Sequence, residues 1–333
     1  MLFRRIVFRL RGGLPFRHEA GHCAAYPAVV GRWHDFACRY RAAEGGQYMS
    51  QTVSFPGLGL EFHFSSVAFT IGSKPIYWYG IVITLGILLA IAYASKRSQQ
   101  FGVKSDDLLD MMLFVLPIAI ICARLYYVAF EWEKYKDNPA EIFAVWHGGL
   151  AIYGGLIGGL ITAIVFCRVR KIDCMDMLDL VAGAVPIGQV LGRWGNFFNC
   201  EAFGSETSLP WRMVIGKGLD EAGQFGNHPT FFYESAWNAI GFVLLYFYSK
   251  KRKYRGEVLL LYFGWYGLGR FFIEGLRTDS LYLWGTGIRV SQVVALISVI
   301  IGFGGFLLNR VMPFLRETAA EVNDNDTNTE ETT

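Results

Sequence analysis

Residues 75–95 read PIYWYGIVITLGILLAIAYAS, a run without one charged side chain. An α-helix needs about 20 predominantly apolar residues to cross the hydrocarbon core of a bilayer. Residues 148–167 and residues 290–309 meet the same requirement. Three uncharged runs of this length predict a polytopic integral membrane protein.

Four further apolar runs each carry, or end at, one ionisable residue. They are residues 111–130 with Arg124, residues 180–192 ending before Arg193, residues 230–249 with Glu234, and residues 258–273 with Arg270. Hydrophobic residues make up 53% of the chain and the mean hydropathy is +0.31, whereas a soluble chain would alternate apolar and polar positions more regularly. We therefore expect an all-α membrane protein of about seven transmembrane helices with a small head region on the outer face.

The connections between these runs indicate their orientation. Lysine and arginine gather after the first, third, fifth and seventh spans, at Lys96, Arg97, Lys104, Arg168, Arg170, Lys171, residues 250–255, Arg310 and Arg316. The positive-inside rule assigns that side to the cytoplasm. The predicted amino terminus is therefore outside, the carboxyl terminus is inside, and residues 193–228 lie at the outer face.

The chain divides into three predicted parts. Residues 1–48 hold eight arginines against three acids and lack the apolar core of a cleavable signal peptide. We interpret them as an upstream extension or a disordered arm, with Met49 as an alternative start. Residues 49–315 form the seven-span domain, and residues 316–333 form an acidic tail that we expect to be disordered in the cytoplasm.

Residues 18–22 read HEAGH and formally match the H-E-x-x-H pattern of zinc metalloproteases. That chemistry needs both histidines on one face of a stable helix and a third ligand. Gly13 and Pro15 precede the match and Gly21 lies inside it, so we interpret it as a coincidence and expect no metal. The chain also lacks a glycine-rich loop of the nucleotide-binding type, so no cofactor is expected.

Residues 192–204 read GRWGNFFNCEAFG, a polar run that begins directly after an apolar stretch. Polar and ionisable residues at membrane depth are costly and usually functional. The candidate site residues in this run are Arg193, Asn196, Asn199 and Glu201. We interpret Cys200 as a packing residue and not as a nucleophile.

Two more arginines, Arg270 and Arg277, fall at the same predicted outer face, and Glu274 follows Arg270 by four residues, which permits an ion pair on one helical face. Planar guanidinium groups bind phosphate oxygens in pairs and keep their charge. The cluster therefore predicts a site for a phospholipid headgroup, with membrane lipid and not nucleic acid as the partner. The alternative is that single arginines merely extend from span ends toward water.

The run GRWGNFFNCEAFG resembles the signature of the prolipoprotein diacylglyceryl transferase family. Further blocks resemble that family in order and spacing: residues 77–80 (YWYG), 123–126 (ARLY), 146–149 (WHGG), 153–155 (YGG), 228–230 (HPT), 233–234 (YE), and Arg270, Phe271, Glu274 and Arg277. The resemblance extends over about residues 55–312.

This resemblance implies transfer of the diacylglyceryl group of phosphatidylglycerol to the lipobox cysteine in the signal peptide of a preprolipoprotein. It places the protein in the bacterial inner membrane, at the first step of lipoprotein maturation. The residues on which the family depends correspond to Arg193, Asn196, Glu201, Arg270 and Glu274, with Tyr79 as a further site member. Asn199 and Arg277 are expected to contact phosphatidylglycerol, and the arginines to stabilise departing glycerol phosphate.

The general base stays open in this sequence. Tyr153 occupies the place where one branch of the family carries a histidine suggested as the base. A tyrosine with an ordinary pKa of about 10 is a poor general base at neutral pH. His147, six residues earlier, is a second candidate, although a solvated loop histidine explains it equally well.

Three other function classes compete with this interpretation. A transporter would show two related halves or broken helices with a site at the midplane, whereas the charges here gather at one face. A membrane phosphatase or headgroup transferase would need a metal-binding carboxylate cluster or a nucleophile near the arginines, but Asp173, Asp176 and Asp179 lie on the predicted cytoplasmic side. A structural protein without catalysis would leave the polar run unexplained.

Overall fold

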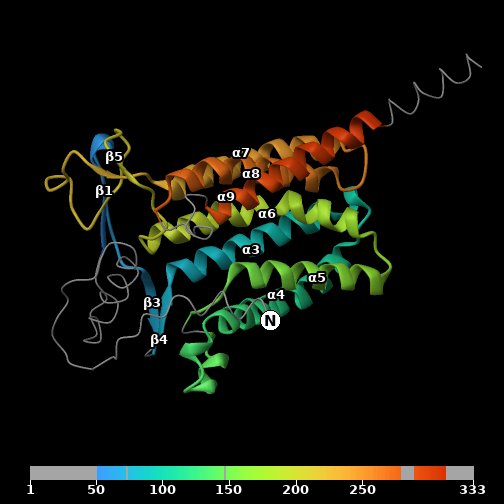
Figure 1. Cartoon of the computed structure of the whole chain (residues 1–333), viewed down its shortest axis with the longest axis horizontal. Helices are drawn as coiled ribbons and strands as arrows, with labels where there is room; N and C mark the ends of the chain where they lie inside the picture. The colour runs from blue at the N-terminus through green and yellow to red at the C-terminus, as the bar shows by residue number, and fades with distance from the viewer. Residues whose placement is uncertain (1–50, 73, 146–147, 279–288, 313–333) are drawn as a thin grey trace, which may run out of the picture. The chain divides into compact units, whose positions relative to one another are not determined.

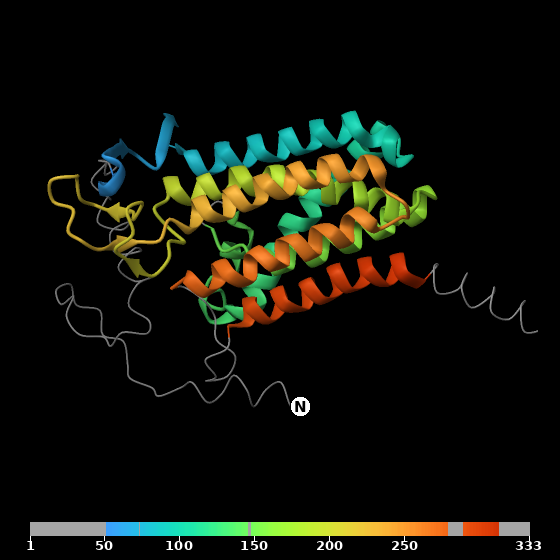
Figure 2. The same ribbon diagram turned by 90° about the horizontal axis from the view of Figure 1, so that it is seen from above.

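Seven long helices dominate the computed structural model, which describes residues 51–72, 74–145, 148–278 and 289–312. The helices are α3 (Trp78–Arg97), α4 (Ser105–Phe130), α5 (Ile152–Arg170), α6 (Cys174–Phe198), α7 (Thr230–Tyr248), α8 (Glu257–Leu276) and α9 (Val290–Val299), the last followed by the π-helical turn η8 (Ile300–Gly304) (Figure 1). Seen from above, α3 and α9 run along opposite sides of the bundle (Figure 2). Short 3-10 turns lie between these helices, namely η3 (Ser98–Phe101), η4 (Trp132–Lys134), η5 (Pro139–Phe143) and η7 (Ser249–Lys251), and one more, η2 (Pro56–Leu58), precedes α3.

Several predictions lie outside the described residues. They are the extension at residues 1–48 with its HEAGH motif, the acidic tail at residues 316–333, and His147. All the described residues belong to one unit, Ser50–Thr333.

The observed helices begin and end near the predicted spans, with one correction that matters for the site. The predicted span covers residues 180–192, whereas α6 continues through the polar run to Phe198. Arg193 and Asn196 therefore lie on the last turns of a helix. A helix backbone satisfies its own hydrogen bonds, so it can extend past the apolar stretch into the polar boundary.

Five of the described helices are long and apolar enough to cross a membrane by length and composition, namely α3 extended through η3, α4, α5, α6, and α9 extended to Met312. Their outward faces carry exposed apolar side chains such as Leu88, Leu113 and Leu156. Contiguous apolar surface of this kind is suited to lipid. Helices α7 and α8 have similar lengths but are more polar, because they bury Glu234, Asn238, Glu257 and Glu274.

Small residues let the helices approach one another closely. A Cβ atom on Gly86 of α3 would lie 3.3 Å from the Cα atom of Gly188 in α6. A Cβ atom on Gly267 of α8 would lie 2.7 Å from the carbonyl oxygen of Ala295 in α9. Helices in lipid gain little from the hydrophobic effect between them, so this close backbone packing contributes much of their association.

The prediction of an all-α chain was incomplete, because short strands precede α3 and follow α6. Strands β1 (Gln51–Phe55), β2 (Leu60–Phe64) and β6 (Val214–Ile215) form one antiparallel sheet in the order β2-β1-β6. Two further antiparallel pairs are β3 (Val67–Ile71) with β4 (Lys74–Tyr77), and β5 (Glu206–Thr207) with β7 (Gly226–Asn227). Strands of two to five residues are too short to give a clear alternating pattern.

An aromatic core joins these strands to the end of α6. Val53 of β1 is fully buried and packs with Phe197 and Phe231 in one cluster. The ring centroids of Phe197 and Phe231 lie 4.9 Å apart, and those of Phe64 and Phe197 lie 5.0 Å apart. The two phenylalanines in the middle of the polar run are therefore packing residues that fix where its polar neighbours point.

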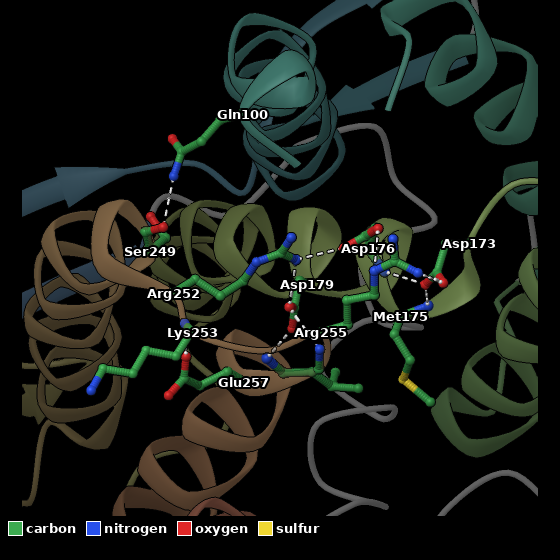
Figure 3. Close-up of polar contacts among 12 residues, drawn as sticks. Gln100, Asp173, Met175, Asp176, Asp179, Ser249, Arg252, Lys253, Arg255 and Glu257 are labelled. Atoms are coloured by element: carbon green, nitrogen blue, oxygen red, sulfur yellow. Dashed lines mark hydrogen bonds and ion pairs between the residues drawn. The ribbon is translucent and has the colours of Figure 1, made fainter. Parts of the chain in front are cut away.

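At the end of the bundle opposite the aromatic core, a network of ion pairs connects the helices (Figure 3). Asp179 on α6 is fully buried. Its carboxylate accepts hydrogen bonds from the backbone N–H groups of Gly256 and Leu259, both at 2.8 Å, and forms an ion pair with Arg252 at 2.9 Å. Helix α8 starts after Gly256, which has no side chain to cap it. Asp179 thus caps α8 from a neighbouring helix.

The same end gathers the basic residues that the sequence placed on one side. Arg97 at the end of α3 donates to Ser249 at 2.8 Å, Arg170 at the end of α5 pairs with Asp110 at 2.7 Å, and Arg310 pairs with buried Glu257 at 2.7 Å. We call this the basic end of the bundle. The candidate site lies at the other end.

We expect Asp179→Ala to destabilise the protein strongly. The change removes the acceptor of two backbone N–H groups at the start of α8 and one of the two carboxylates that pair with Arg252, which keeps its contact with Asp176 at 2.8 Å. A buried donor that loses its partner costs about 1–3 kcal/mol. Asp110→Ala is the matched control, because the Asp110–Arg170 pair is nearly half exposed on both sides and such pairs contribute about 0–1 kcal/mol. Thermal unfolding in detergent measures both variants, and equal shifts in Tm would contradict the capping role.

Candidate functional site

A buried glutamate joins two arginines from neighbouring helices. Glu234 of α7 is 3% exposed. Its Oε1 atom lies 2.5 Å from Nη2 of Arg193 on α6, and its Oε2 atom lies 3.0 Å from Nη1 of Arg270 on α8. Each carboxylate oxygen therefore binds one arginine, and one side chain fixes three helices at this end of the bundle.

A second glutamate holds Arg270 from its other side. Oε2 of Glu274 lies 2.5 Å from Nη2 of Arg270, which confirms the predicted pair on one helical face. Glu274 is 2% exposed, and its backbone carbonyl accepts a hydrogen bond from Arg289 at the start of α9. Arg270 is thus oriented by two carboxylates from two helices.

A chain of amide contacts links Arg193 to Glu201. Nη1 of Arg193 donates to Oδ1 of Asn196 at 3.3 Å, and Nδ2 of Asn196 donates to Oε1 of Glu201 at 3.0 Å. Nδ2 of Asn199 donates to the same oxygen at 3.2 Å. Glu201 therefore orients Arg193 through Asn196, and all four polar residues predicted from the run belong to one network.

The backbone around Glu201 is strained and then anchored. Its neighbours Cys200 and Ala202 have φ angles of 51° and 56°, values that cost a residue with a side chain about 1–3 kcal/mol each. Thr230 donates to the carbonyl of Ala202 at 2.6 Å, and the N–H of Gly204 donates to the carbonyl of His228 at 2.9 Å. These contacts hold the turn against the start of α7, so that the carboxylate of Glu201 faces the two asparagines.

Two more predicted residues border this network. A Cβ atom on Gly195 would lie 2.8 Å from the ring of Tyr79, which interacts electrostatically with Arg193 and Glu201. Arg277 pairs with Gly204 in an isolated β-bridge at the end of α8. Tyr266 of α8 interacts electrostatically with Glu234, Arg270, Arg193 and Arg277, which places Arg277 beside the same group of charges.

Tyr153, the first candidate for a base, is 40% exposed near the start of α5. The next residue, Gly154, packs against α4, since a Cβ atom there would lie 2.5 Å from the carbonyl oxygen of Cys122. The described contacts do not place the Tyr153 hydroxyl in the arginine network. His147 lies outside the described residues.

Arg124, which the sequence identified as a charge inside a span and as part of a family-like block, forms a structural centre at the connection between α4 and α5. Its guanidinium is 4% exposed and donates to the carbonyls of Glu141, Ile142, Ala144, Gly148 and Gly149 at 2.5–3.4 Å. Gly149 has φ +74°, and a Cβ atom there would lie 2.4 Å from Nη1 of Arg124. This arginine fixes the connection that leads into α5.

Two titrating groups beside the network, Cys200 and His228, have pKa values that burial shifts toward the neutral form. Burial raises the pKa of the Cys200 thiol to about 12, so this cysteine carries no thiolate and suits the packing role predicted for it. Burial also lowers the pKa of His228, so its imidazole stays uncharged. Among residues 51–72, 74–145, 148–278 and 289–312 no group of three His, Cys, Asp or Glu side chains could hold a metal.

Sequence reasoning missed the central residue of this arrangement. Glu234 was identified only as a charge inside an apolar run and as part of a family-like block. One feature of the sequence does indicate its role, because a glutamate inside an apolar segment needs a cationic partner. Among the described residues, four arginines and three glutamates lie at this end: Arg193, Arg270, Arg277 and Arg289 with Glu201, Glu234 and Glu274. Such a site can bind an anion.

Comparisons with known proteins agree on one family. The chain matches the prolipoprotein diacylglyceryl transferase family over residues 66–308. It is 42% identical over 253 residues to the phosphatidylglycerol--prolipoprotein diacylglyceryl transferase of Lysinibacillus sphaericus, covering 74% of this chain and 92% of the relative. The proteins of the same name from Enterococcus faecalis and Bacillus velezensis are 45% identical over 262 residues and 41% identical over 263 residues. These alignments cover 76% and 77% of this chain, and 93% and 96% of the relatives.

We expect Glu234→Ala to lower the Tm more than Glu201→Ala. Removing Glu234 leaves two guanidinium groups without their shared partner, which costs about 3–5 kcal/mol. Glu201 contacts neutral amides, so its loss costs about 1–3 kcal/mol. Thermal unfolding of the two variants in detergent makes the comparison, and a smaller shift for Glu234→Ala would show that the bridge does not hold the helices.

Proposed function

The chain belongs to the prolipoprotein diacylglyceryl transferase family, and from this premise we propose that it transfers the diacylglyceryl group of phosphatidylglycerol to the lipobox cysteine of a preprolipoprotein. The observation that carries the proposal for the site is the Arg193–Glu234–Arg270 bridge. It brings two permanently charged groups together at one end of the bundle. Phosphatidylglycerol offers them a phosphodiester anion.

We place the protein in the bacterial inner membrane with seven spans. Helices α7 and α8 pack on α6 and carry their polar residues inside the bundle, which supports counting them with the five apolar helices. The basic end then faces the cytoplasm by the positive-inside rule. The arginine network faces outward with the amino terminus and the small strands of the head, and the carboxyl terminus faces inward.

The reaction is a displacement at carbon. The electron pair of the peptide thiolate forms a C–S bond with the glyceryl carbon, and the C–O bond to phosphate breaks. Its electron pair goes to the phosphate oxygen, so glycerol phosphate leaves with one more negative charge than the bound ester had. Cationic donors that meet this growing charge lower the barrier.

The two arginines are suited to that role. Glu234, Glu274 and Asn196 use four of the N–H groups of Arg193 and Arg270, whereas each guanidinium has five. The remaining donors can bind phosphate oxygens while the carboxylates keep the side chains in place. Asn199 contacts Glu201, Tyr79 lies against Gly195 and Arg277 pairs with Gly204. We include these three residues in the proposed phosphatidylglycerol site.

The thiolate must come from the peptide, because Cys200 of the protein is neutral and buried. A free cysteine has a pKa of about 8.5, and nearby guanidinium groups raise its thiolate fraction. Tyr153 and His147 stay our two candidates for a base. The arginine network offers a third route, in which electrostatics alone increases ionisation.

The decisive experiment incubates the purified protein with phosphatidylglycerol vesicles and a lipobox peptide and follows the peptide by mass spectrometry. We expect a mass increase equal to one diacylglyceryl group, and none for a peptide with serine in place of cysteine. An unmodified cysteine peptide, under conditions where a relative from the family works, would overturn the proposed function.

We expect Arg193→Ala and Arg270→Ala each to abolish transfer, because each removes charge that stabilises the leaving phosphate, an effect of about 10²–10³-fold or more. Arg170→Ala is the matched control, since Arg170 lies at the basic end. Initial rates on the lipobox peptide measure the effect. Near-normal rates for either site variant would refute the role of the arginines.

The base is tested with Tyr153→Phe and His147→Gln. If either side chain removes the thiol proton, its variant will lose activity at neutral pH and recover part of it as pH rises, because the peptide cysteine then ionises by itself. Rate profiles between pH 6 and 9 measure this. Unchanged profiles for both variants would leave arginine-promoted ionisation as the explanation.

A further inference from the structure

Two tryptophans connect helices α7 and α8, which are neighbours in the bundle (Figure 1). The rings of Trp237 and Trp265 are stacked, with centroids 4.3 Å apart and planes 15° from parallel. Nε1 of Trp237 donates to the backbone carbonyl of Trp265 at 2.9 Å, and Nε1 of Trp265 donates to the carbonyl of Trp237 at 3.0 Å. The contact is reciprocal, so each residue is both donor and acceptor.

A glycine one turn after each tryptophan makes this contact possible. A Cβ atom on Gly241 would lie 2.4 Å from Nε1 of Trp265, and a Cβ atom on Gly269 would lie 2.2 Å from Nε1 of Trp237. In an α-helix a carbonyl faces the residue four positions later. Glycine at that position leaves the carbonyl open to the indole of the other helix. The pattern Trp-x-x-x-Gly therefore occurs once on each helix, at residues 237–241 and 265–269.

The tryptophan pair lies directly beside the arginine network. Glu234 precedes Trp237 by one helical turn, and Arg270 follows Gly269 in the chain. The contact between Glu234 and Arg270 measures 3.0 Å. Sliding one helix by a single residue moves its side chains about 1.5 Å along the axis and about 100° around it. Such a slip would break the contact, so its geometry depends on the register of α7 against α8.

The tryptophan pair fixes the register of α7 against α8 in lipid, and we call it the register lock. Helices in a bilayer lack a hydrophobic driving force toward each other, so hydrogen bonds between them carry specificity. An indole N–H without a partner in hydrocarbon is costly. Both donors are satisfied in one relative position of the two helices, where each indole also meets the glycine of the other.

We propose that Trp237 and Trp265, with Gly241 and Gly269, form a positioning device that holds Glu234 against Arg270 and so keeps the phosphate-binding arginines in place. The tryptophans touch neither substrate in this proposal and act through Glu234. The inference rests on the proposed function for its effect on transfer, but its effect on the Glu234–Arg270 contact is independent of that function.

The test uses Gly269→Ala, which inserts a methyl group at the indole of Trp237, and Trp237→Phe, which keeps a ring but removes the donor. Gly183→Ala on α6 is the matched control, because no atom of another described helix lies within 4 Å of the Cβ position there. At temperatures where each variant is folded, we expect Gly269→Ala and Trp237→Phe to lower kcat/KM for phosphatidylglycerol about 10- to 100-fold, as a misplacement near 1 Å does. Gly183→Ala should keep the wild-type value.

A double-mutant cycle separates positioning from general packing. Thermal unfolding is measured for wild type, Gly269→Ala, Glu234→Gln and the double variant. A lock that acts through Glu234 predicts coupling, so that Gly269→Ala lowers Tm less when the carboxylate is already absent. Additive Tm shifts, or wild-type kcat/KM in both lock variants, would overturn the proposal.

If Gly269→Ala does not fold, Trp237→Phe takes its place in the cycle. If the wild-type protein shows no transfer, the proposed function fails and the unfolding cycle alone decides on the lock. The two failures are therefore distinguishable.

Discussion

The bridge from Glu234 to Arg193 and Arg270 is the interaction on which the rest of this end of the protein depends. A charge buried near hydrocarbon is costly unless it is paired and hydrogen-bonded. Glu234 meets this condition only when α6, α7 and α8 hold both arginines within reach. The carboxylate therefore fixes the relative positions of three helices, and it also keeps two cations close together that would otherwise repel each other.

The remaining structure supports this bridge from several directions. The turn after α6 accepts two positive φ angles and is anchored to the start of α7, which orients Glu201 and, through Asn196, Arg193. At the basic end, Asp179 caps α8 and joins it to α6. At the other end, Glu234 holds Arg193 and Arg270 close together. Two guanidinium groups held in this way suit that end to binding an anionic lipid headgroup.

The sequence predicted the long helices well, because uncharged runs such as residues 75–95 are a local property. It also predicted the Arg270–Glu274 pair, since residues four apart share a helical face. The partners of Glu234 could not be predicted in this way, because they lie 41 and 36 residues away and depend on how helices pack. The five carbonyl groups that bind Arg124 could not be predicted for the same reason, because they come from a connection without a regular sequence pattern. The short strands were not predicted, because their pairing depends on the aromatic core around Phe197.

The claim that Glu234 holds the two arginines as one phosphate site has a direct test. An experimental structure of the protein with phosphatidylglycerol bound would locate the phosphate group. We predict its oxygens within hydrogen-bond distance, about 2.7–3.2 Å, of both Arg193 and Arg270 while Glu234 still contacts both side chains. A phosphate that binds away from both arginines, or that binds them only after Glu234 has moved away, would contradict the account.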